Sequence, residues 1–222
     1  MTHRLPLTAV GVALCVVSGA MVASAAANDA QLELKYRAYA PDITRAEVPP
    51  TPTPAPLSVP YNGPVESLHL AAARLDAGWP VEVRDTYFAG GREFFEDPSA
   101  PQRIAWYSRF GQPGYIGSNS IFAGHIDYVG FGKGPFGYLT SASAGDALYL
   151  TMDNETAYTY TVKSIATVAL ANLDMDAVVF PALAPGVERV TLISCGGTFV
   201  PYAGGGGEYT SRVILVAERY VN

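Results

Sequence analysis

Cysteine is nearly absent from this sequence: among 222 residues, only Cys15 and Cys195 occur. Cys15 lies in an apolar run near the N-terminus and Cys195 lies far downstream, so a disulfide framework is not expected. An unpaired cysteine is a liability in an exported domain unless it is buried or chemically useful. A buried structural cysteine is therefore the ordinary alternative to a reactive one.

Basic clusters and metal-ligating clusters are also missing. The 14 Lys and Arg residues are scattered and the net charge is −6, so nucleic acid is not expected as a partner. There is no close His/Cys pair and no calcium-loop pattern, so neither a metal site nor a cofactor is expected. Hydrophobic residues make up 49% of the chain, which is enough for a packed core.

Long hydrophobic runs are limited to one, Leu5 to Ala27, which carries no charge over 23 residues. As a helix it would be roughly 34 Å long, enough to cross a membrane core of about 30 Å. A basic residue precedes it and acidic residues follow it, which predicts that the rest of the chain lies outside the cytoplasm. Residues 1–27 are thus predicted to be a membrane anchor or, if cleaved near Ala23-Ser24-Ala25, a signal peptide. Both alternatives stay open, and the protein is either anchored at the extracellular face or secreted.

A proline-rich stalk or linker is predicted over residues 28–60. The segment Val48 to Pro60 reads VPPTPTPAPLSVP, and such a composition favours an extended polyproline conformation. From Tyr61 onward, short β-rich runs alternate with Gly, Pro, Asp and Asn breaks. Residues 61–222 are therefore predicted to form one folded domain.

This domain is predicted to be all-β, because eight β-rich runs occur and no long amphipathic helical period does. A hairpin is expected around Asp153-Asn154-Glu155, and short helical turns at Pro135–Leu139 and Asp176–Phe180. About eight strands in such a length suit a closed β-barrel or a sandwich. The predicted strands are Val65–Leu70, Pro80–Thr86, Arg103–Tyr107, Ser118–Ala123, Ala147–Met152, Thr156–Val168, Arg189–Ser194 and Ser211–Tyr220.

The choice of catalytic candidates is narrow, because the domain holds one cysteine and two histidines. His69 alternates with leucines inside an early strand, which favours an ordinary strand residue. His125 follows Phe122-Ala123-Gly124, where a strand runs out, and Cys195 lies between a strand and Gly196-Gly197. Glycine at a strand end allows close backbone approach or unusual dihedral angles, and such ends present side chains to clefts.

Arg212 precedes the apolar run Val213 to Ala217 in the last predicted strand. A charge so close to a buried strand needs a partner or a cleft. The domain holds eight arginines, so an ordinary strand-edge residue is the alternative interpretation of its position.

Taken together, these residues resemble the sortase family of cysteine transpeptidases. Phe122-Ala123-Gly124-His125 resembles its Ala-Gly-His signature, and Thr191 to Cys195 (TLISC) resembles its Thr-Leu-x-Thr-Cys signature. Arg212 follows in the order that the family keeps, and the resemblance covers roughly residues 64–221. It is closest to the single-domain sortases of classes E and F. Ser194 in place of Thr and the glycine-rich segment 204–207 depart from the family pattern.

The resemblance implies a closed β-barrel of about eight strands and a defined chemistry. Sortases cut a C-terminal Leu-Pro-x-Thr-Gly-like sorting signal through a thioacyl-enzyme and join it to an amine. Here Cys195 would be the nucleophile, His125 the acid/base and Arg212 the electrostatic partner of the oxyanion. The implied partners are a surface protein with a sorting signal and an amine acceptor, such as a cell-wall precursor or a pilin lysine. Substrate-binding residues are not identified.

Two alternatives come from other classes of protein. The L,D-transpeptidases are cell-wall enzymes that also use Cys, His and Arg, but their Ser-x-Gly-Cys-x-Arg context differs from Ser194-Cys195-Gly196. A non-catalytic surface β-domain that binds a partner is compatible with the composition. The reactivity of Cys195 toward thiol reagents would distinguish an enzyme from such a binding module.

Overall fold

The computed structural model describes residues 60–203 and 206–221. The predicted membrane segment 1–27 and nearly all of the predicted linker 28–60 lie outside these residues. Within the described part of the chain, no helix is long and apolar enough to span a membrane.

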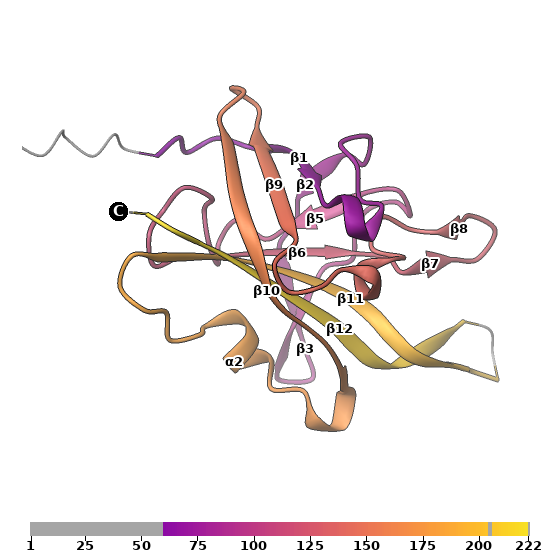
Figure 1. The fold of residues 1–222 in the computed structure, drawn as a ribbon. Helices are drawn as coiled ribbons and strands as arrows, with labels where there is room; N and C mark the ends of the chain where they lie inside the picture. The colour runs from indigo at the N-terminus through magenta and orange to yellow at the C-terminus, as the bar shows by residue number, and fades with distance from the viewer. Residues whose placement is uncertain (1–59, 204–205, 222) are drawn as a thin grey trace, which may run out of the picture. The chain divides into compact units, whose positions relative to one another are not determined.

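All eight predicted β-rich runs form strands, and together they make one sheet (Figure 1). Its strand order is β1-β9-β10-β12-β11-β6-β5-β2. The prediction of an all-β domain is therefore confirmed. The strands of this sheet are β1 (Val65–His69), β2 (Val81–Val83), β5 (Ile104–Trp106), β6 (Asn119–Gly124), β9 (Ala147–Met152), β10 (Ala157–Ala169), β11 (Val187–Pro201) and β12 (Gly207–Tyr220).

The sheet rolls into a nearly closed barrel. Its edge strands β1 and β2 contact each other, but the sheet order contains no hydrogen-bonded ladder between them in the described residues. Most neighbours are antiparallel, whereas β11 runs parallel to β6 and β2 runs parallel to β5. The parallel pair β11 and β6 brings two segments that are distant in sequence side by side, with Ile193 opposite Ala123.

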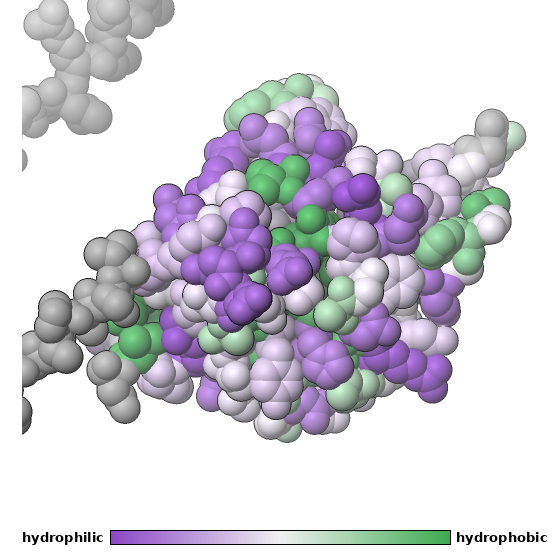
Figure 2. Space-filling view, turned by 90° about the horizontal axis from the view of Figure 1, so that it is seen from above, coloured by the Kyte–Doolittle hydropathy of each residue, from purple (hydrophilic) through white to green (hydrophobic). Residues whose placement is uncertain are grey.

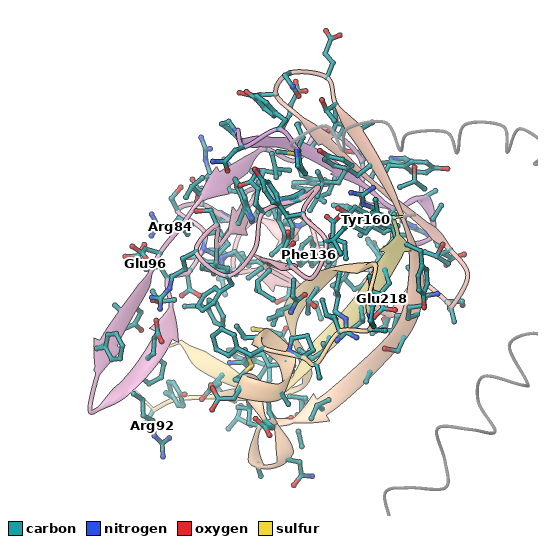
Figure 3. All side chains as sticks on the ribbon, turned by 90° about the vertical axis from the view of Figure 1, so that its left-hand side faces the viewer. Arg84, Arg92, Glu96, Phe136, Tyr160 and Glu218 are labelled. Atoms are coloured by element: carbon teal, nitrogen blue, oxygen red, sulfur yellow. The ribbon has the colours of Figure 1, made fainter. Side chains whose placement is uncertain are left out.

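Each face of the sheet buries its own hydrophobic cluster. The barrel interior holds Phe122, Leu192 and Leu215, and Figure 3 labels Phe136 and Tyr160, which are both at most 1% exposed. Alternate residues of the same strands point to the opposite face, as the two-residue period of a strand requires. The second cluster on that face consists of Ala105, Tyr107, Ile121, Val179, Ile193 and Ile214.

A hairpin and a short helix cover this second face. The hairpin strands β3 (Thr86–Ala89) and β4 (Arg92–Phe95) and the helix α2 (Met175–Val179) lie on the same side of the sheet in Figure 1. Arg84 and Glu96 form an ion pair of 3.2 Å at the base of the hairpin (Figure 3). These elements restrict access to the second face from one side.

The elements that the sequence analysis missed or misplaced are short. Neither the β3–β4 hairpin nor the strands β7 (Asp127–Tyr128) and β8 (Gly132–Lys133) was predicted. The helical turn expected at Pro135–Leu139 is a run of turns that leads into the 3₁₀ helix η2 (Leu139–Ser141). The helix expected at Asp176–Phe180 is α2, shifted by one residue. Two further 3₁₀ turns are η1 (Ala71–Ala73) and η3 (Leu170–Asn172).

One buried carboxylate fastens a loop to the barrel. Glu188, on β11, is fully buried and accepts hydrogen bonds from the Gly114 backbone N–H at 2.7 Å, from Arg219 Nε at 2.6 Å and from the Tyr160 hydroxyl. A buried charge with this many donors avoids the penalty of an unpaired one. The loop that contains Gly114 is thereby tied to the end of the barrel from which β6 and β11 start.

Candidate active site

Cys195 lies inside β11 rather than at its end. The sequence analysis predicted that Gly196-Gly197 would terminate the strand, and this prediction was wrong because β11 continues to Pro201. The glycines instead form a β-bulge: Gly196 pairs with Ser211 and Phe199 with Tyr209, so β11 uses one residue more than β12. The bulge bends the strand pair directly after the thiol.

Both glycines have a steric reason to be there. A Cβ at Gly196 would lie 2.8 Å from Val213 Cγ2, which is closer than side chains normally approach. Gly197 has a φ of +77°, a left-handed conformation that glycine adopts without strain. The sequence Cys-Gly-Gly therefore places the thiol beside a bulge in which residues other than glycine would clash at position 196 or be strained at position 197.

Arg212 lies directly opposite Cys195 in the antiparallel β11–β12 ladder. Residues opposite each other in such a ladder point to the same face, with Cβ atoms about 4.5–5.5 Å apart. The sequence analysis placed Arg212 at the start of the last strand, but β12 begins earlier, at Gly207. Arg212 is thus an internal strand residue whose side chain lies on the same face as Cys195.

The guanidinium of Arg212 already has partners on its own strand. Its Nη1 donates to the carbonyl oxygens of Tyr209 at 3.3 Å and Ser211 at 3.1 Å, and its Nη2 pairs with Glu208 Oε1 at 3.3 Å. The Glu208 side chain is half exposed, so this ion pair is weakly held and can exchange for another anion. Glu208 was not predicted from the sequence, although a residue four positions away on a strand shares the face of Arg212.

His125 follows β6 immediately, as predicted from the sequence. The last pair of the parallel β6–β11 ladder is Ala123 with Ile193, and two residues further the strands reach His125 and Cys195. The register therefore places His125 level with Cys195 on the neighbouring strand. The register thus brings three residues from distant parts of the sequence to the same level of the sheet: His125 just past the end of β6, Cys195 within β11 and Arg212 within β12.

Gly124 is required by packing rather than by backbone conformation. A Cβ at this position would lie 2.9 Å from two atoms of the Phe136 ring, which fills the barrel interior beneath it. The Phe136 backbone N–H also donates to the carbonyl oxygen of His125 at 3.1 Å. The glycine before the histidine thus lets the backbone lie against Phe136, and Phe136 fixes the chain at His125.

Burial dominates the electrostatics of the thiol. Burial raises the pKa of Cys195, and the Arg212 guanidinium lowers that pKa without offsetting the effect of burial. The charges of Asp97, Glu208 and Asp127 raise the pKa further. The neutral thiol is therefore favoured overall, although Arg212 favours the thiolate. Attack by Cys195 therefore needs a base to take the proton.

The remaining candidates from the sequence have other roles. His69 is an exposed residue of β1 whose ring lies 6.0 Å from that of Tyr149, consistent with an ordinary strand residue. Asp127, two residues after His125, accepts hydrogen bonds from the Tyr209 hydroxyl and pairs with Lys133 at 3.8 Å, and no hydrogen bond between it and His125 occurs in the described residues. In the described part of the chain, no group of His, Cys, Asp or Glu side chains is suited to hold a metal ion.

The hydroxyl of Ser194 does not belong to the site. Ser194 is 3% exposed and, being adjacent to Cys195 in the strand, points to the opposite face. Its Oγ has no hydrogen-bond partner in the described residues. The side chain at position 194 therefore belongs to the barrel interior rather than to the face that carries the thiol.

Two cavities lie elsewhere on the surface. One of about 80 Å³ separates the β3–β4 hairpin from α2 and is lined mainly by aromatic and aliphatic residues such as Phe95, Phe110 and Val179. Another of about 260 Å³ is lined by charged residues, including Arg84, Asp85 and Glu96. Neither is lined by Cys195, but the smaller cavity lies against the second hydrophobic cluster, on the face that carries the thiol.

The β11–β12 pair extends past the site as a long arm. Figure 1 shows the two strands running together beyond the barrel, and Figure 2 shows hydrophobic residues on the resulting protrusion. Phe199, Val200 and Tyr202 on this arm are 43%, 47% and 55% exposed. The site therefore lies at the base of a projection that carries exposed hydrophobic side chains.

Comparisons with known proteins agree with the geometry. The family model for the sortase domain matches residues 84–220. A comparison with curated proteins finds no match.

A comparison with solved structures finds sortases at low sequence identity. Sortase A from Corynebacterium diphtheriae is 21% identical with a TM-score of 0.47, covering 72% of this chain and 62% of that one. Sortase C from Streptococcus pneumoniae is 17% identical with a TM-score of 0.48, covering 73% and 72%. A sortase from Actinomyces oris is 19% identical with a TM-score of 0.47, covering 79% and 88%. The chain spans about three fifths of the length of the Corynebacterium enzyme. The closeness to classes E and F stays a prediction. The family model matches well over half of the chain, and the protein belongs to the sortase family.

Proposed function

We propose that this protein cleaves a Leu-Pro-x-Thr-Gly-like sorting signal and transfers the acyl group to an amine, with Cys195, His125 and Arg212 as its catalytic residues. The observation that carries the proposal is that Arg212 lies opposite Cys195 in one ladder, while the parallel β6–β11 register, continued two residues past Ala123 and Ile193, brings His125 level with Cys195. Membership of the sortase family supports the reaction class.

The first half-reaction forms a thioester. The Cys195 sulfur attacks the carbonyl carbon of the scissile amide as its proton passes to His125, and the amide oxygen becomes an oxyanion. Arg212 exchanges Glu208 for this oxyanion, because the guanidinium lies on the same face and its ion pair is weak. The C–N bond then breaks, and His125 donates the proton to the leaving amine.

In the second half-reaction an amine is the attacking group and the Cys195 thiolate is the leaving group. An incoming amine attacks the thioester carbonyl and gives a proton to His125, and the thiolate leaves and is reprotonated. Water in place of the amine would give simple hydrolysis. The acceptor we propose is an amine on the cell surface, such as a cell-wall precursor or a pilin lysine.

A peptide library tests the reaction class. The full chain is incubated with peptides of the Leu-Pro-x-Thr-Gly type and a small amine, and products are identified by mass. Transfer to the amine after Thr supports the proposal, whereas the absence of cleavage in every peptide contradicts it. An L,D-transpeptidase would instead act on peptides that contain D-amino acids, and a binding module would leave all peptides intact.

Arg212→Ala is expected to slow thioacyl formation by about 10²–10³-fold, because it removes a donor to the oxyanion. The apparent peptide affinity should change less, since the oxyanion exists only near the transition state. Arg212→Lys keeps the charge but loses the planar fork, so it should recover part of the rate. Single-turnover acylation measures both variants.

Arg189→Ala is the matched control for Arg212. Arg189 also pairs with a glutamate, Glu218 on β12, at 2.6 Å. It lies on β11 opposite Asn119, at the end of the β6–β11 ladder that is distant from His125. This control should be acylated at the parent rate, and equal rates for Arg212→Ala and Arg189→Ala would mean that Arg212 is a structural strand residue.

We also propose that the domain functions at the extracellular face of the cytoplasmic membrane, or free of the cell if residues 1–27 are removed. The uncharged run Leu5 to Ala27 and its basic flank support this location. Protease added to intact cells that express the full chain is expected to digest residues 61–222. A cytoplasmic marker protein serves as the control, and equal protection of both proteins would contradict the proposed location.

A further inference from the structure

Tyr209, on β12, connects the strand pair of the thiol to the segment that follows His125. Its hydroxyl donates to both carboxylate oxygens of Asp127, at 2.7 and 2.8 Å. Asp127 begins β7, two residues after His125, and also pairs with Lys133 across the β7–β8 hairpin. In the described residues, this is the side-chain hydrogen bond that joins the β7–β8 hairpin to β12.

The same residue also holds Arg212. The main-chain carbonyl oxygen of Tyr209 accepts a hydrogen bond from Arg212 Nη1 at 3.3 Å. The Tyr209 ring packs edge-on against Phe199, its partner across the bulge after Cys195, with ring centroids 5.2 Å apart. Tyr209 is therefore held in place by Phe199 on the arm, and it contacts both Asp127 and Arg212.

The β7–β8 hairpin, which Tyr209 holds through Asp127, also contacts His125. The ring of Tyr128, next to Asp127, lies 5.4 Å from the His125 ring in an edge-to-face arrangement. The described residues provide the imidazole with no side-chain hydrogen bond to a carboxylate, so packing and backbone contacts set its orientation. The bond from Tyr209 to Asp127 fixes the hairpin that carries this packing partner.

The phenol remains a neutral donor across the working pH range. Its hydrogen bond to Asp127 raises the pKa of Tyr209 to about 12, with smaller contributions from burial and from the charge of Asp127. A phenol that stays neutral donates a hydrogen bond but does not exchange protons with the substrate. The observations thus favour a role in geometry over a role in proton transfer.

We propose that Tyr209 is a positioning residue: its hydroxyl, through Asp127, holds the His125 segment in register with Cys195 and Arg212. This inference rests on the proposed function, since it assigns to Tyr209 the alignment of the same three catalytic groups. Small displacements of a catalytic group are costly, because proton transfer and attack need atoms within a few tenths of an ångström of their places.

The test uses single-turnover acylation of the full chain by a Leu-Pro-x-Thr-Gly peptide. Tyr209→Phe keeps the ring and its contact with Phe199 but removes the donor, and it should slow acylation by about tenfold to a hundredfold at unchanged KM. Asp127→Ala should be slowed similarly, and Asp127→Asn, which keeps an acceptor oxygen, should recover part of the rate. The double variant Tyr209→Phe/Asp127→Ala should be no slower than the slower single variant.

Tyr115→Phe is the control, because the Tyr115 hydroxyl donates to the Pro60 carbonyl at 3.2 Å, in a loop near the start of β6 rather than at its active-site end. It should acylate at the parent rate. A parent rate for Tyr209→Phe, or losses that multiply in the double variant, would overturn the proposal.

A second readout separates this proposal from the proposed function. Alkylation of Cys195 by iodoacetamide near neutral pH, followed by peptide mass spectrometry, needs no peptide substrate. Tyr209→Phe and Asp127→Ala should each slow it several-fold, with no further loss in the double variant. If none of the peptides acylates the parent protein, the proposed function fails, and the alkylation rates alone then decide the role of Tyr209. Unchanged alkylation in both single variants would refute that role in this case.

Discussion

Cys195→Ala is expected to abolish both cleavage and transfer while leaving the domain folded. The variant removes the sulfur that forms the acyl bond, and no neighbouring group can replace it. Cys195 is partly buried and its thiol makes no hydrogen bond in the described residues, so the loss of one sulfur atom should have little effect on stability. Turnover is measured with a sorting-signal peptide, and folding by thermal unfolding.

Cys15 supplies the matched control for this experiment, because it is the other cysteine of the chain. Cys15→Ala should retain the parent rate, whereas Cys195→Ser should be inactive or nearly so, since a serine hydroxyl is a much weaker nucleophile than a thiol. Substantial turnover by Cys195→Ala would contradict the mechanism. A loss confined to Cys15→Ala would point to a different nucleophile.

His125→Ala is expected to lower the rate by about 10²–10⁴-fold, the usual contribution of a general acid/base. The loss should be large here because burial raises the pKa of Cys195, so few molecules hold a thiolate near neutral pH without a base. Raising the pH should recover part of the acylation rate in His125→Ala, since the thiol then ionises without help. Rates are measured from neutral pH to above the ordinary thiol pKa.

His69→Ala is the comparison for His125→Ala. His69 is exposed on β1, at an edge of the sheet, and its replacement should leave acylation at the parent rate at every pH. If the two variants lost similar amounts of activity, the acid/base assignment would be wrong. If His125→Ala showed no recovery at high pH, His125 would be acting on the leaving amine rather than on the thiol.

The main sheet could be predicted because its strands carry local signals. Runs such as Ala147–Met152 and Thr156–Val168 are rich in residues that favour strands, and the turn between them is marked by Asp153-Asn154-Glu155. Glu155 has a φ of +68° in this hairpin, as a tight turn requires. Strand pairing was less predictable, because the parallel contact between β6 and β11 joins residues far apart in sequence.

Pairs of glycines in the sequence were poor predictors of where strands turn or end. Gly90-Gly91 both have positive φ and form the turn of the β3–β4 hairpin, a pattern that could have been recognised but was not. Gly196-Gly197 was interpreted as a strand end and is a bulge, because glycine marks both features in a sequence. The difference depends on whether the partner strand continues, and that information is tertiary.

The candidate site followed from the scarcity of cysteine and histidine together with the resemblance to sortases. The proposed role of Arg212 came from that resemblance. The structure shows that Arg212 lies opposite Cys195 in the β11–β12 ladder. Glu208 and Tyr209 were not found from the sequence, because neither belongs to a motif and both act through partners brought close by folding. Residues that support a site in this way become visible once contacts are known.

The most direct test of the account is the intact mass of the full chain after brief mixing with a Leu-Pro-x-Thr-Gly peptide in the absence of an amine. The account predicts a covalent adduct equal to the acyl portion that ends in Thr. The adduct should map to Cys195, be released by hydroxylamine as expected of a thioester, and be absent from Cys195→Ala. Peptide cleavage without any adduct on Cys195, or an adduct that persists in Cys195→Ala, would contradict the central claim that Cys195 carries the acyl group.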